Sequence, residues 1–314
     1  MTRVLVTGAA GQIGSALVPA LREAYGEAEV LATDLHPPAA DTGPFAVLDC
    51  TDGRAVAAQV AAHRPTVVFH LAALLSAVGE RKPQTAFEVN LGGLFTLLEV
   101  ARESRFAVFT PSSIAAFGPS TPRDGTPQDT LQRPTTMYGV TKVAGELLCD
   151  YYHTRYGVDT RGVRYPGIIS DSPPGGGTTD YAVEIFFAAV EEGRYTSFLK
   201  RGTQLDMMYM PDAVRAAMEV MEADPARLVH RNAFNVTAMQ LTPERLGDAI
   251  RRHLPDFELD FDPDPLRQSI ADSWPNRLDD SAAREEWDWR PQFDLDAMTD
   301  DLLRRIRERV GARR

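Results

Sequence analysis

A tyrosine and a lysine stand four positions apart in the segment Tyr138-Gly-Val-Thr-Lys142. On a helix this spacing places both side chains on one face, one turn apart, where they can reach the same bound substrate. A phenol with an ordinary pKa of about 10 is a weak base at neutral pH, but a neighbouring cation favours the phenolate. The pair could therefore take a proton from an alcohol. The same spacing also arises by chance, so this chemistry needs support from the rest of the chain.

Two hydroxyl groups follow a nearby apolar run, in the sequence Phe109-Thr-Pro-Ser112-Ser113. Ser113 precedes Tyr138 by 25 residues, enough chain for a loop to bring the two side chains together. A hydroxyl there can hold the reacting oxygen and stabilise the charge that develops on it. We therefore predict Tyr138, Lys142 and Ser113 as the catalytic residues.

The N-terminal segment has the pattern of a dinucleotide-binding loop. The apolar run from Arg3 to Thr7 predicts a strand and Ser15 to Ala24 a helix, and Gly8-Ala-Ala-Gly11-Gln-Ile-Gly14 lies between them. Glycines let the backbone approach a pyrophosphate, and the helix N-terminus supplies N–H donors. The spacing is one residue longer than the common Gly-x-Gly-x-x-Gly, and a glycine loop alone is weak evidence.

Asp34 follows Gly14 by 20 residues, after the predicted strand Val30 to Thr33. A carboxylate there accepts hydrogen bonds from the adenosine ribose and repels a 2′-phosphate, and no arginine directly follows the glycines to bind one. NAD is therefore predicted in preference to NADP. A solvated aspartate at a strand end is the alternative interpretation.

Strands and helices alternate through the first half of the chain. Further strands are expected at Phe45 to Leu48, Val67 to Leu71, Phe106 to Thr110 and Asp159 to Arg164, and helices at Arg54 to His63, Thr85 to Ser104 and Tyr138 to Tyr156. This alternation predicts an α/β fold with a doubly wound parallel sheet, in which ligands bind at the carboxyl ends of the strands. Small residues in His70-Leu-Ala-Ala73 leave room for a cofactor at one such end.

The pattern changes after Tyr165-Pro166-Gly167. We predict an NAD-binding Rossmann domain over residues 1–165 and a smaller, mixed substrate-binding part over residues 166–314, with segments that return to the first. The segment Pro173-Pro-Gly-Gly-Gly-Thr-Thr-Asp180 is too rich in glycine and proline for a helix or strand. It is predicted to be a substrate loop, with a flexible linker as the alternative. Leu295 to Arg314 is expected to be a charged amphipathic helix on the surface.

Length and composition limit the classes of protein. The 314 residues are 44% hydrophobic and 25% charged, as in globular proteins, and the net charge of -11 argues against nucleic acid and anionic membranes. No apolar run approaches the ~18 residues of a membrane span, and Thr2-Arg3 leads directly into a strand-like run, so we expect a cytoplasmic protein. The six histidines and two cysteines show no metal-type spacing, which predicts no metal site.

Taken together, the glycine loop, Asp34, the small residues after His70, the serine pair and the Tyr-x-x-x-Lys segment resemble the extended short-chain dehydrogenase/reductase superfamily over nearly the whole chain. Within it, the chain is most similar to the L-threonine 3-dehydrogenase branch, which is epimerase-like in fold. The similar segments are Leu71-Ala-Ala-Leu-Leu-Ser76, Arg164-Tyr-Pro-Gly-Ile-Ile-Ser170, Pro174-Gly-Gly-Gly-Thr-Thr-Asp-Tyr-Ala-Val183 and Leu205-Asp-Met-Met-Tyr-Met-Pro-Asp212. The Gly-Gly-Gly-Thr-Thr-Asp sequence discriminates best, because relatives that act on nucleotide sugars do not carry it.

The resemblance implies metal-independent, NAD-dependent oxidation of L-threonine at its Cβ hydroxyl to 2-amino-3-oxobutyrate, a step of threonine catabolism. It makes Tyr138 the base, Lys142 the group that lowers the phenol pKa and holds the nicotinamide ribose, and Ser113 the contact to the reacting hydroxyl. The residues expected to contact NAD are Gly8, Gly11, Gln12, Ile13, Gly14, Asp34, Leu35, Asp49, Cys50, Leu71, Ala72, Ala73, Asn90, Ser112, Tyr138, Lys142, Tyr165 and Ile168. Those expected to contact the substrate are Ser76, Ser113, Tyr138, Gly177, Thr178, Thr179 and Asp180.

A zwitterionic substrate needs donors for its carboxylate and an acceptor for its ammonium group. We assign Ser76 and Thr178 or Thr179 to the carboxylate and Asp180 to the ammonium group, and we place no arginine there. The helices Thr85 to Ser104 and Tyr138 to Tyr156 are apolar on more than one face, which fits the four-helix interface of homodimers in the superfamily.

Two other functions stay open. A nucleotide-sugar epimerase or dehydratase of the same superfamily is the nearer alternative, and it requires a roomy anion-binding pocket. A non-catalytic regulator that senses NAD is the more distant one, because it leaves Tyr138, Lys142 and Ser113 without a role.

Overall fold

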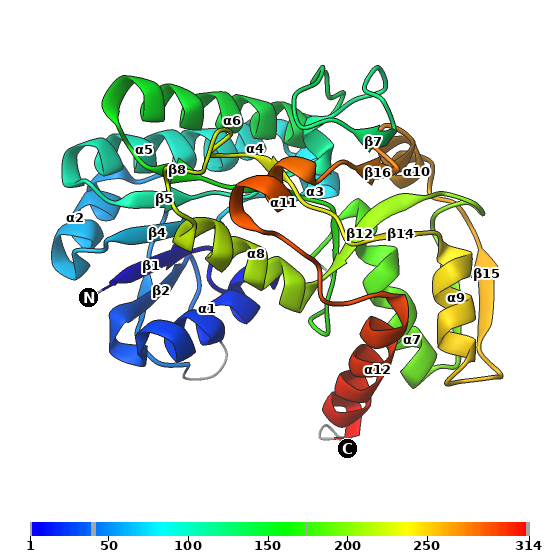
Figure 1. Cartoon of the computed structure of the whole chain (residues 1–314). Helices are drawn as coiled ribbons and strands as arrows, with labels where there is room; N and C mark the ends of the chain where they lie inside the picture. The colour runs from blue at the N-terminus through cyan, green and yellow to red at the C-terminus, as the bar shows by residue number, and fades with distance from the viewer. Residues whose placement is uncertain (1, 39–41, 174, 312–314) are drawn as a thin grey trace.

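A six-stranded parallel sheet forms the first half of the molecule (Figure 1). The computed structural model describes residues 2–38, 42–173 and 175–311. The strand order is β3-β2-β1-β4-β5-β8, so the order reverses between β1 and β4. The strands are β1 (Val4–Thr7), β2 (Val30–Asp34), β3 (Phe45–Val47), β4 (Val67–His70), β5 (Ala107–Phe109) and β8 (Thr160–Arg161). The predicted α/β fold with a doubly wound parallel sheet is confirmed.

Helices cover both faces of this sheet because successive strand residues point to opposite sides. Val4 and Val6 pack in one hydrophobic cluster with α1 (Gln12–Tyr25) and α8 (Met210–Glu222). Leu5 packs in a second cluster on the other face. The helices of that second face are α2 (Gly53–His63), α5 (Gly93–Ser104) and α6 (Met137–Tyr156). Strands buried on both faces read as continuous apolar runs, as the sequence does here.

The helix expected over Thr85 to Ser104 is a continuous helical segment with a wider turn inside it. It consists of α4 (Pro83–Ala86), the π-helical turn η2 (Phe87–Gly92) and α5. Such single π-helical turns occur often near functional sites. Asn90 lies in this turn and forms hydrogen bonds with the segment that follows β4.

The prediction of a single strand over Asp159 to Arg164 is wrong, because the chain forms two strands there, on either side of Gly162. β8 stays in the large sheet, whereas β9 (Val163–Tyr165) pairs with β6 (Ser112–Ser113) and β13 (Phe234–Asn235). A Cβ at Gly162 would lie 2.2 Å from the main-chain oxygen of Thr110, so this close approach requires glycine. The division brings the serine pair beside Arg164 and Tyr165.

A third hydrophobic cluster lies beside the large sheet, among the elements at the right of Figure 1. Its sheet pairs β10 (Gly167–Ile169) in parallel with β12 (Leu205–Tyr209), and β12 antiparallel with β14 (Met239–Leu241). Two further parallel pairs are β11 (Arg194–Ser197) with β15 (Glu258–Phe261) and β7 (Asp124–Thr126) with β16 (Arg277–Leu278). The remaining helices are α3 (Ser76–Arg81), α7 (Tyr181–Glu191), α9 (Pro243–Arg251), α10 (Pro265–Asp272), α11 (Ser281–Trp287) and α12 (Leu295–Gly311). Three 3₁₀ turns are η1 (Glu27–Glu29), η3 (Ile114–Ala116) and η4 (Thr178–Asp180).

The last helix, α12, is more buried than a surface helix. Met298, Leu302 and Ile306 are fully buried in the third cluster, where α12 packs against α7. The expectation of a helix is confirmed for Leu295–Gly311, and residues 312–314 lie outside the described part of the chain.

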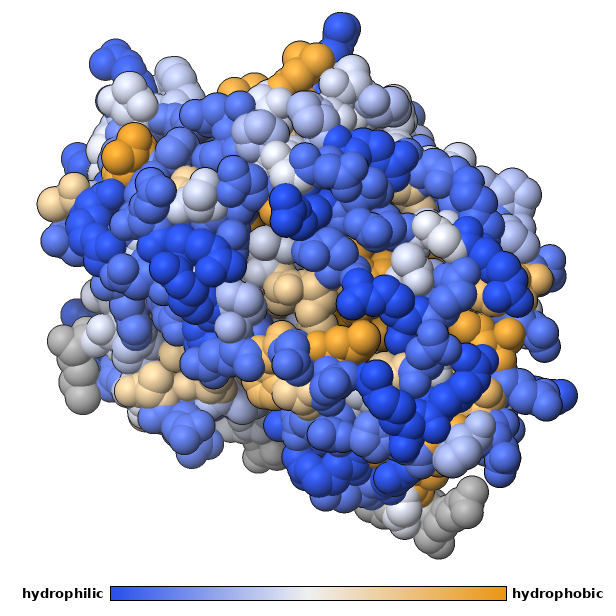
Figure 2. All heavy atoms as spheres, turned by 45° about the vertical axis from the view of Figure 1, so that its right-hand side comes forward, coloured by the Kyte–Doolittle hydropathy of each residue, from blue (hydrophilic) through white to orange (hydrophobic). Residues whose placement is uncertain are grey.

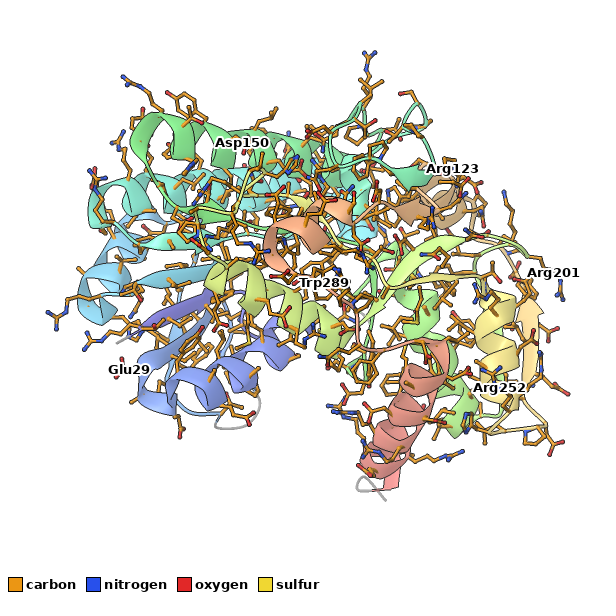
Figure 3. All side chains as sticks on the ribbon, in the orientation of Figure 1. Glu29, Arg123, Asp150, Arg201, Arg252 and Trp289 are labelled. Carbon is orange, nitrogen blue, oxygen red and sulfur yellow. The ribbon has the colours of Figure 1, made fainter. Side chains whose placement is uncertain are left out.

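Segments after residue 165 return to the large sheet. The helices α8 and α11 join the cluster that contains α1, and so does Trp289, which Figure 3 shows beside α8. Met207, Met208 and Met210 are buried. The boundary between residues 165 and 166 stays a prediction, since side chains from both sides of it share one core.

The outer surface is mostly hydrophilic on the face shown in Figure 2, with apolar side chains in small patches. Within the described ranges, every helix is too short or too polar to cross a membrane.

Candidate active site

A cavity of about 430 Å³ opens at the carboxyl ends of β1 and β4, where the strand order reverses. This is where open parallel sheets bind ligands, and the volume is typical of small-molecule sites. The predicted residues that line it are Gly8, Gly11, Gln12, Ile13, Gly14, Leu71, Ala73, Ser76, Ser112, Ser113, Tyr138, Lys142, Tyr165, Ile168, Gly177, Thr178, Thr179 and Asp180. The fold therefore brings most of the predicted site into one cavity.

The loop between β1 and α1 has the geometry of a phosphate cradle. Gly8 has a positive φ of 70°, and a Cβ there would lie 2.6 Å from the main-chain nitrogen of Ala72. A Cβ on Gly14 would lie 2.4 Å from the main-chain oxygen of Gly8. The N-cap residue of α1 is Gly11, which has no side chain to cap the helix, so the first-turn N–H groups can bind an anion. These features fit the pyrophosphate of a dinucleotide.

Asp34 ends β2 beside this loop. Its carboxylate accepts hydrogen bonds from the main-chain nitrogens of Ala10 at 2.9 Å and Leu35 at 2.7 Å. The carboxylate is thus held at the rim of the glycine loop, where an adenosine ribose is expected. Leu35 and Val47 are exposed beside it and offer an apolar surface.

Four other predicted cofactor contacts lie outside the cavity lining. Ala72 packs against Gly8, and Cys50 is buried against Gly93. Asp49 accepts hydrogen bonds from the main chain and hydroxyl of Thr51. Their contact with a cofactor, like that of Leu35, stays a prediction.

Asn90 also lies outside the cavity lining, and it holds the lining in place. Its amide donates to the main-chain oxygen of Leu74 at 3.1 Å and accepts from the Leu74 nitrogen at 2.7 Å. The same amide donates to Thr141 on α6 at 3.3 Å. Asn90 therefore ties the segment after β4 to the helix that carries Tyr138 and Lys142.

The three predicted catalytic residues meet in the cavity. Thr136 caps α6 by accepting a hydrogen bond from Gly139, so the helix begins at Met137 and Tyr138 lies in its first turn. β6, which carries Ser113, packs against α6, and the Ser113 side chain lies close enough to the Tyr138 phenol to lower its pKa. The Lys142 ammonium lies 5.3 Å from the centre of the Tyr138 ring. The predicted association of these residues is thus present in the geometry, and their catalytic roles stay a proposal.

Burial governs the ionisation of this group. Burial raises the pKa of Tyr138 to about 12, and the nearby Ser113 side chain opposes the rise. Burial lowers the pKa of Lys142 to about 8, and the charge of Glu146 opposes that change. Burial, with the charge of Lys142, lowers the pKa of His70 to about 4, so His70 is neutral near pH 7.

The glycine-rich loop closes the other side of the cavity. The Ser76 hydroxyl lies 3.3 Å from that of Thr178, so the two predicted carboxylate ligands are adjacent. Asp180 accepts hydrogen bonds from the main-chain nitrogens of Gly176 and Gly177, both at 2.7 Å. This carboxylate therefore organises the loop besides lining the cavity. Pro174 of this loop lies outside the described residues.

Sequence reasoning missed part of the lining. Trp274, which follows α10, is 4% exposed and lines the cavity, and its indole N–H has no hydrogen-bond partner within the part of the chain that the structure describes. No motif surrounds Trp274, so only the fold could reveal it. The other missed lining residues are Leu74, Leu75, Val78, Pro111, Ile114, Pro166, Gly167 and Gly175.

The described residues contain no group of three or more His, Cys, Asp and Glu side chains able to hold a metal ion.

Comparisons with known proteins agree with this geometry. The model of the NAD dependent epimerase/dehydratase family matches residues 4–237. An uncharacterised epimerase/dehydratase of Staphylococcus saprophyticus is 55% identical over 96% of both chains. The crystal structure of L-threonine dehydrogenase from Clostridium difficile is 52% identical, covers 98% of both chains and superposes with a TM-score of 0.96. A monomeric L-threonine 3-dehydrogenase from a metagenome is 45% identical, with a TM-score of 0.95 over 97% of this chain and 99% of that one.

Proposed function

Because the chain belongs to the NAD dependent epimerase/dehydratase family, and is an NAD-dependent oxidoreductase, we propose that it oxidises L-threonine at Cβ to 2-amino-3-oxobutyrate. The observation that carries this proposal is the meeting of Tyr138, Lys142 and Ser113 with the Gly177–Asp180 segment in one cavity. The first three residues suit the oxidation of an alcohol. The Gly177–Asp180 segment belongs to the sequence that favoured an amino-acid substrate over a nucleotide sugar.

The chemistry assigned to these residues is a proton transfer. Bound NAD supplies the acceptor for the hydride that leaves Cβ. The Tyr138 oxygen takes the proton of the substrate hydroxyl, and Ser113 donates a hydrogen bond that stabilises the charge on the reacting oxygen. Lys142 provides a positive charge beside the phenol.

The walls of the cavity suit a small zwitterion. The adjacent hydroxyls of Ser76 and Thr178 supply donors for a carboxylate, and Thr179 lines the same wall. The indole N–H of Trp274 is a buried donor that a ligand carboxylate would satisfy, and such donors are costly to leave unpaired. Asp180, which lines the same cavity, is the predicted acceptor for the ammonium group. The same carboxylate also accepts hydrogen bonds from the main-chain nitrogens of Gly176 and Gly177, so Asp180 orders the loop as well.

The direct test is NADH absorbance after L-threonine is added to the protein with NAD. We expect NADH from L-threonine, less from L-serine, and none from D-threonine or uridine-diphosphate-galactose. Tyr138→Phe should abolish turnover while NADH binding, measured by fluorescence, persists. No NADH from L-threonine in the wild-type protein would contradict the proposal.

The two alternatives differ in what they require. An epimerase must accommodate a nucleotide sugar next to the cofactor, and a cavity of about 430 Å³ shared with the glycine loop favours a smaller substrate. A regulator without chemistry would leave the partly buried group of Ser113, Tyr138 and Lys142 unused. Turnover of uridine-diphosphate-galactose would support the epimerase. Turnover of neither substrate would support the regulator.

We also propose a homodimer through one face of α5 and α6. Five apolar residues on η2, α5 and α6 are between 48% and 62% exposed: Phe87, Phe95, Val140, Leu147 and Tyr151. The two helices pack together, and the Phe95 and Tyr151 rings both contact Tyr152, so the exposed residues form one surface. A second copy of the chain that presents the same helices would bury it. The monomeric relative shows that similar chains do not always pair.

Metal independence, a place in threonine catabolism and a cytoplasmic location stay predictions from the sequence. Chelation followed by the NADH assay tests the first, because activity should survive it.

A further inference from the structure

The segment of residues 111–113, which carries the serine pair, is attached to successive turns of α6. Ser113 lies close enough to Tyr138 to lower the pKa of the phenol, and the main-chain oxygen of Pro111 accepts a hydrogen bond from Lys142 Nζ at 2.7 Å. Because the two α6 residues are four positions apart, they lie on one face of the helix. The segment therefore runs along that face.

Glu146, one turn further along the same face, binds the residue between these two contacts. Its carboxylate accepts a hydrogen bond from the hydroxyl of Ser112. The same carboxylate accepts from Gln132 Nε2 at 2.7 Å and from Arg164 Nε and Nη2 at 3.0 and 2.8 Å. The hydrogen bonds of Glu146 thus go to Ser112 and to two residues that pack around it, Gln132 and Arg164. The proposed oxidation assigns Glu146 no chemical role.

Arg164 holds the carboxylate from the neighbouring strand. It lies opposite Ser112 in the pairing of β6 with β9. Its third nitrogen donates to the main-chain oxygen of Gln128 at 2.7 Å and to the side-chain oxygen of Asn235 at 3.1 Å. Since the guanidinium is planar and bonded on three sides, it fixes the carboxylate in one orientation.

Stability is a weak reason for this ion pair. The side chains of Glu146 and Arg164 are only 5% and 7% exposed, so both charges have lost their hydration. Well-packed apolar residues often replace such a pair without loss of stability. A positional role is therefore the stronger explanation, because an apolar pair could not bind Ser112.

On the basis of the proposed function, we infer that Glu146, fixed by Arg164, is a positioning residue. It holds Ser112 against α6, and so keeps the hydroxyl of Ser113 at Tyr138. Its negative charge also faces Lys142 and stabilises the ammonium form there.

The surroundings of Lys142 allow this charge to be tested. The ionisable groups that face Lys142 or Glu146 are His70 from β4, Tyr138, Cys149 and Asp150 from α6, and Arg164 from β9. Burial keeps His70 and Cys149 neutral near pH 7, since it lowers the pKa of the former and raises that of the latter. Replacing Glu146 thus removes a negative charge that stabilises the ammonium form of Lys142.

The first experiment follows Lys142 directly. The chain has three lysines, Lys82, Lys142 and Lys200, so protein labelled with ¹³C at lysine Cε gives three NMR signals. Lys82→Arg and Lys200→Arg assign them. In Glu146→Gln we expect the Lys142 midpoint to fall by about one pH unit while the other two stay, because a buried opposite charge has been removed. We expect kcat with L-threonine to fall about 100-fold, with the KM for NAD within about twofold, because the hydroxyl is misplaced.

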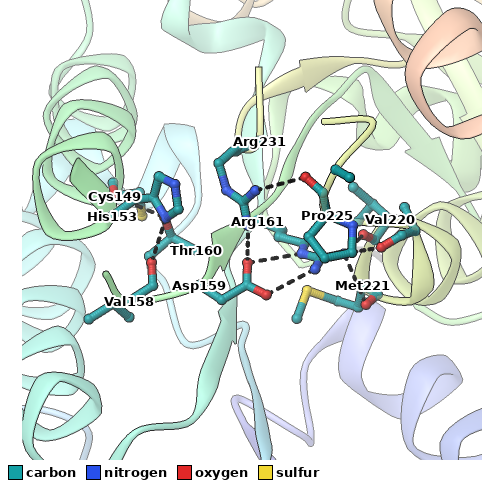
Figure 4. A network of polar contacts seen from close by, with 12 residues as sticks. Cys149, His153, Val158, Asp159, Thr160, Arg161, Val220, Met221, Pro225 and Arg231 are labelled. Carbon is teal, nitrogen blue, oxygen red and sulfur yellow. Dashed lines mark hydrogen bonds and ion pairs between the residues drawn. The ribbon is translucent and has the colours of Figure 1, made fainter. Parts of the chain in front are cut away.

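Two variants separate positioning from folding. Glu146→Met combined with Arg164→Met replaces the ion pair by apolar side chains and should melt near the wild-type temperature, with kcat still reduced about 100-fold. Asp159→Asn is the matched control. Asp159 pairs with Arg161 at 2.9 Å and with Arg231 at 2.8 Å, and Figure 4 shows both pairs. The hydrogen-bond partners of Glu146 among the described residues are Ser112, Gln132 and Arg164, which do not belong to this network. Asp159→Asn should lower the melting temperature and leave kcat and the Lys142 midpoint unchanged.

The inference is overturned if the double variant recovers wild-type kcat, or if Glu146→Gln leaves the Lys142 midpoint in place. If the wild-type protein forms no NADH from L-threonine, the proposed function fails. The Lys142 titration still tests the Glu146 contact in that case, because it requires no substrate.

Discussion

Lys142 donates to the main-chain oxygen of Pro111 at 2.7 Å, and its nitrogen lies over the Tyr138 ring, 5.3 Å from the centre, instead of binding the phenol oxygen. The influences on the Tyr138 pKa in this structure are burial, which raises it to about 12, and Ser113, which lowers it. The predicted lowering by Lys142 therefore stays a prediction. Lys142 can lower the pKa of Tyr138 either through the electrostatic effect of its ammonium group over the ring, or after a ligand breaks its hydrogen bond with Pro111.

Lys142→Met tests that assistance. With the positive charge removed, the phenolate is less favoured, so the acid limb of the kcat profile should move to higher pH and kcat should fall about 100-fold. Because burial lowers the pKa of Lys142 to about 8, its charge is present below that pH and lost above it. Lys200→Met, at a half-exposed lysine paired with Asp272, is the control and should behave as wild type. An acid limb that does not move would refute the electrostatic role.

Gly14→Ala should weaken cofactor binding. The new Cβ would lie 2.4 Å from the Gly8 oxygen, and the loop would have to open where a pyrophosphate is expected. We expect the Kd for NADH, measured by fluorescence, to rise at least about tenfold, which corresponds to about 1.4 kcal/mol. Gly53→Ala is the matched control because its Cβ would make an ordinary 3.5 Å contact with Thr96. Equal affinity in the two variants would contradict the role of the cradle.

Asp34→Asn should weaken the choice of NAD over NADP. The amide can still accept a hydrogen bond from Ala10 or Leu35, but it no longer repels a 2′-phosphate. The ratio of kcat/KM values for NAD and NADP should fall about tenfold or more, a change of about 1.4 kcal/mol. A ratio that stays at the wild-type value would place the ribose elsewhere.

Asp206 makes the stability depend on pH away from the active site. It is fully buried on β12 and accepts hydrogen bonds from Thr237 and from the main chain of Leu278. Burial raises its pKa from 3.8 to about 7, so the folded state binds a proton that the unfolded state releases between these values. Its contribution is present below about pH 4 and is lost as the pH rises through about 7.

In Asp206→Asn the side chain stays neutral at every pH. The melting temperature should therefore fall less between pH 5 and 8 than in the wild-type protein. Over this range the free energy of unfolding of the wild-type protein should fall by on the order of 3 kcal/mol more than that of the variant. Differential scanning calorimetry across that range measures it. Parallel pH profiles of the two proteins would show that Asp206 is ionised throughout.

Leu147→Glu tests the proposed dimer. Leu147 is 62% exposed on α6 and is one of the five exposed apolar residues of the proposed interface, where two symmetry-related charges would repel each other. The mass measured by sedimentation velocity should fall from that of a dimer in the wild-type protein to that of a single 34.5 kDa chain in the variant. Val229→Glu, at a residue 80% exposed outside α5 and α6, is the control and should leave the mass unchanged. A wild-type protein that sediments as one chain would dispose of the dimer.

The sequence alone determined the parallel sheet, the glycine loop and the stripe that carries Tyr138 and Lys142. These features depend on neighbouring residues: apolar runs predict strands, glycines permit close turns, and a spacing of four defines a helix face. Only the tertiary structure decided that Gly162 divides a strand, that Trp274 reaches the cavity, and that Arg164 and Glu146 hold Ser112. Those contacts join residues far apart in the chain, and they depend on how complete elements pack, which no short pattern records.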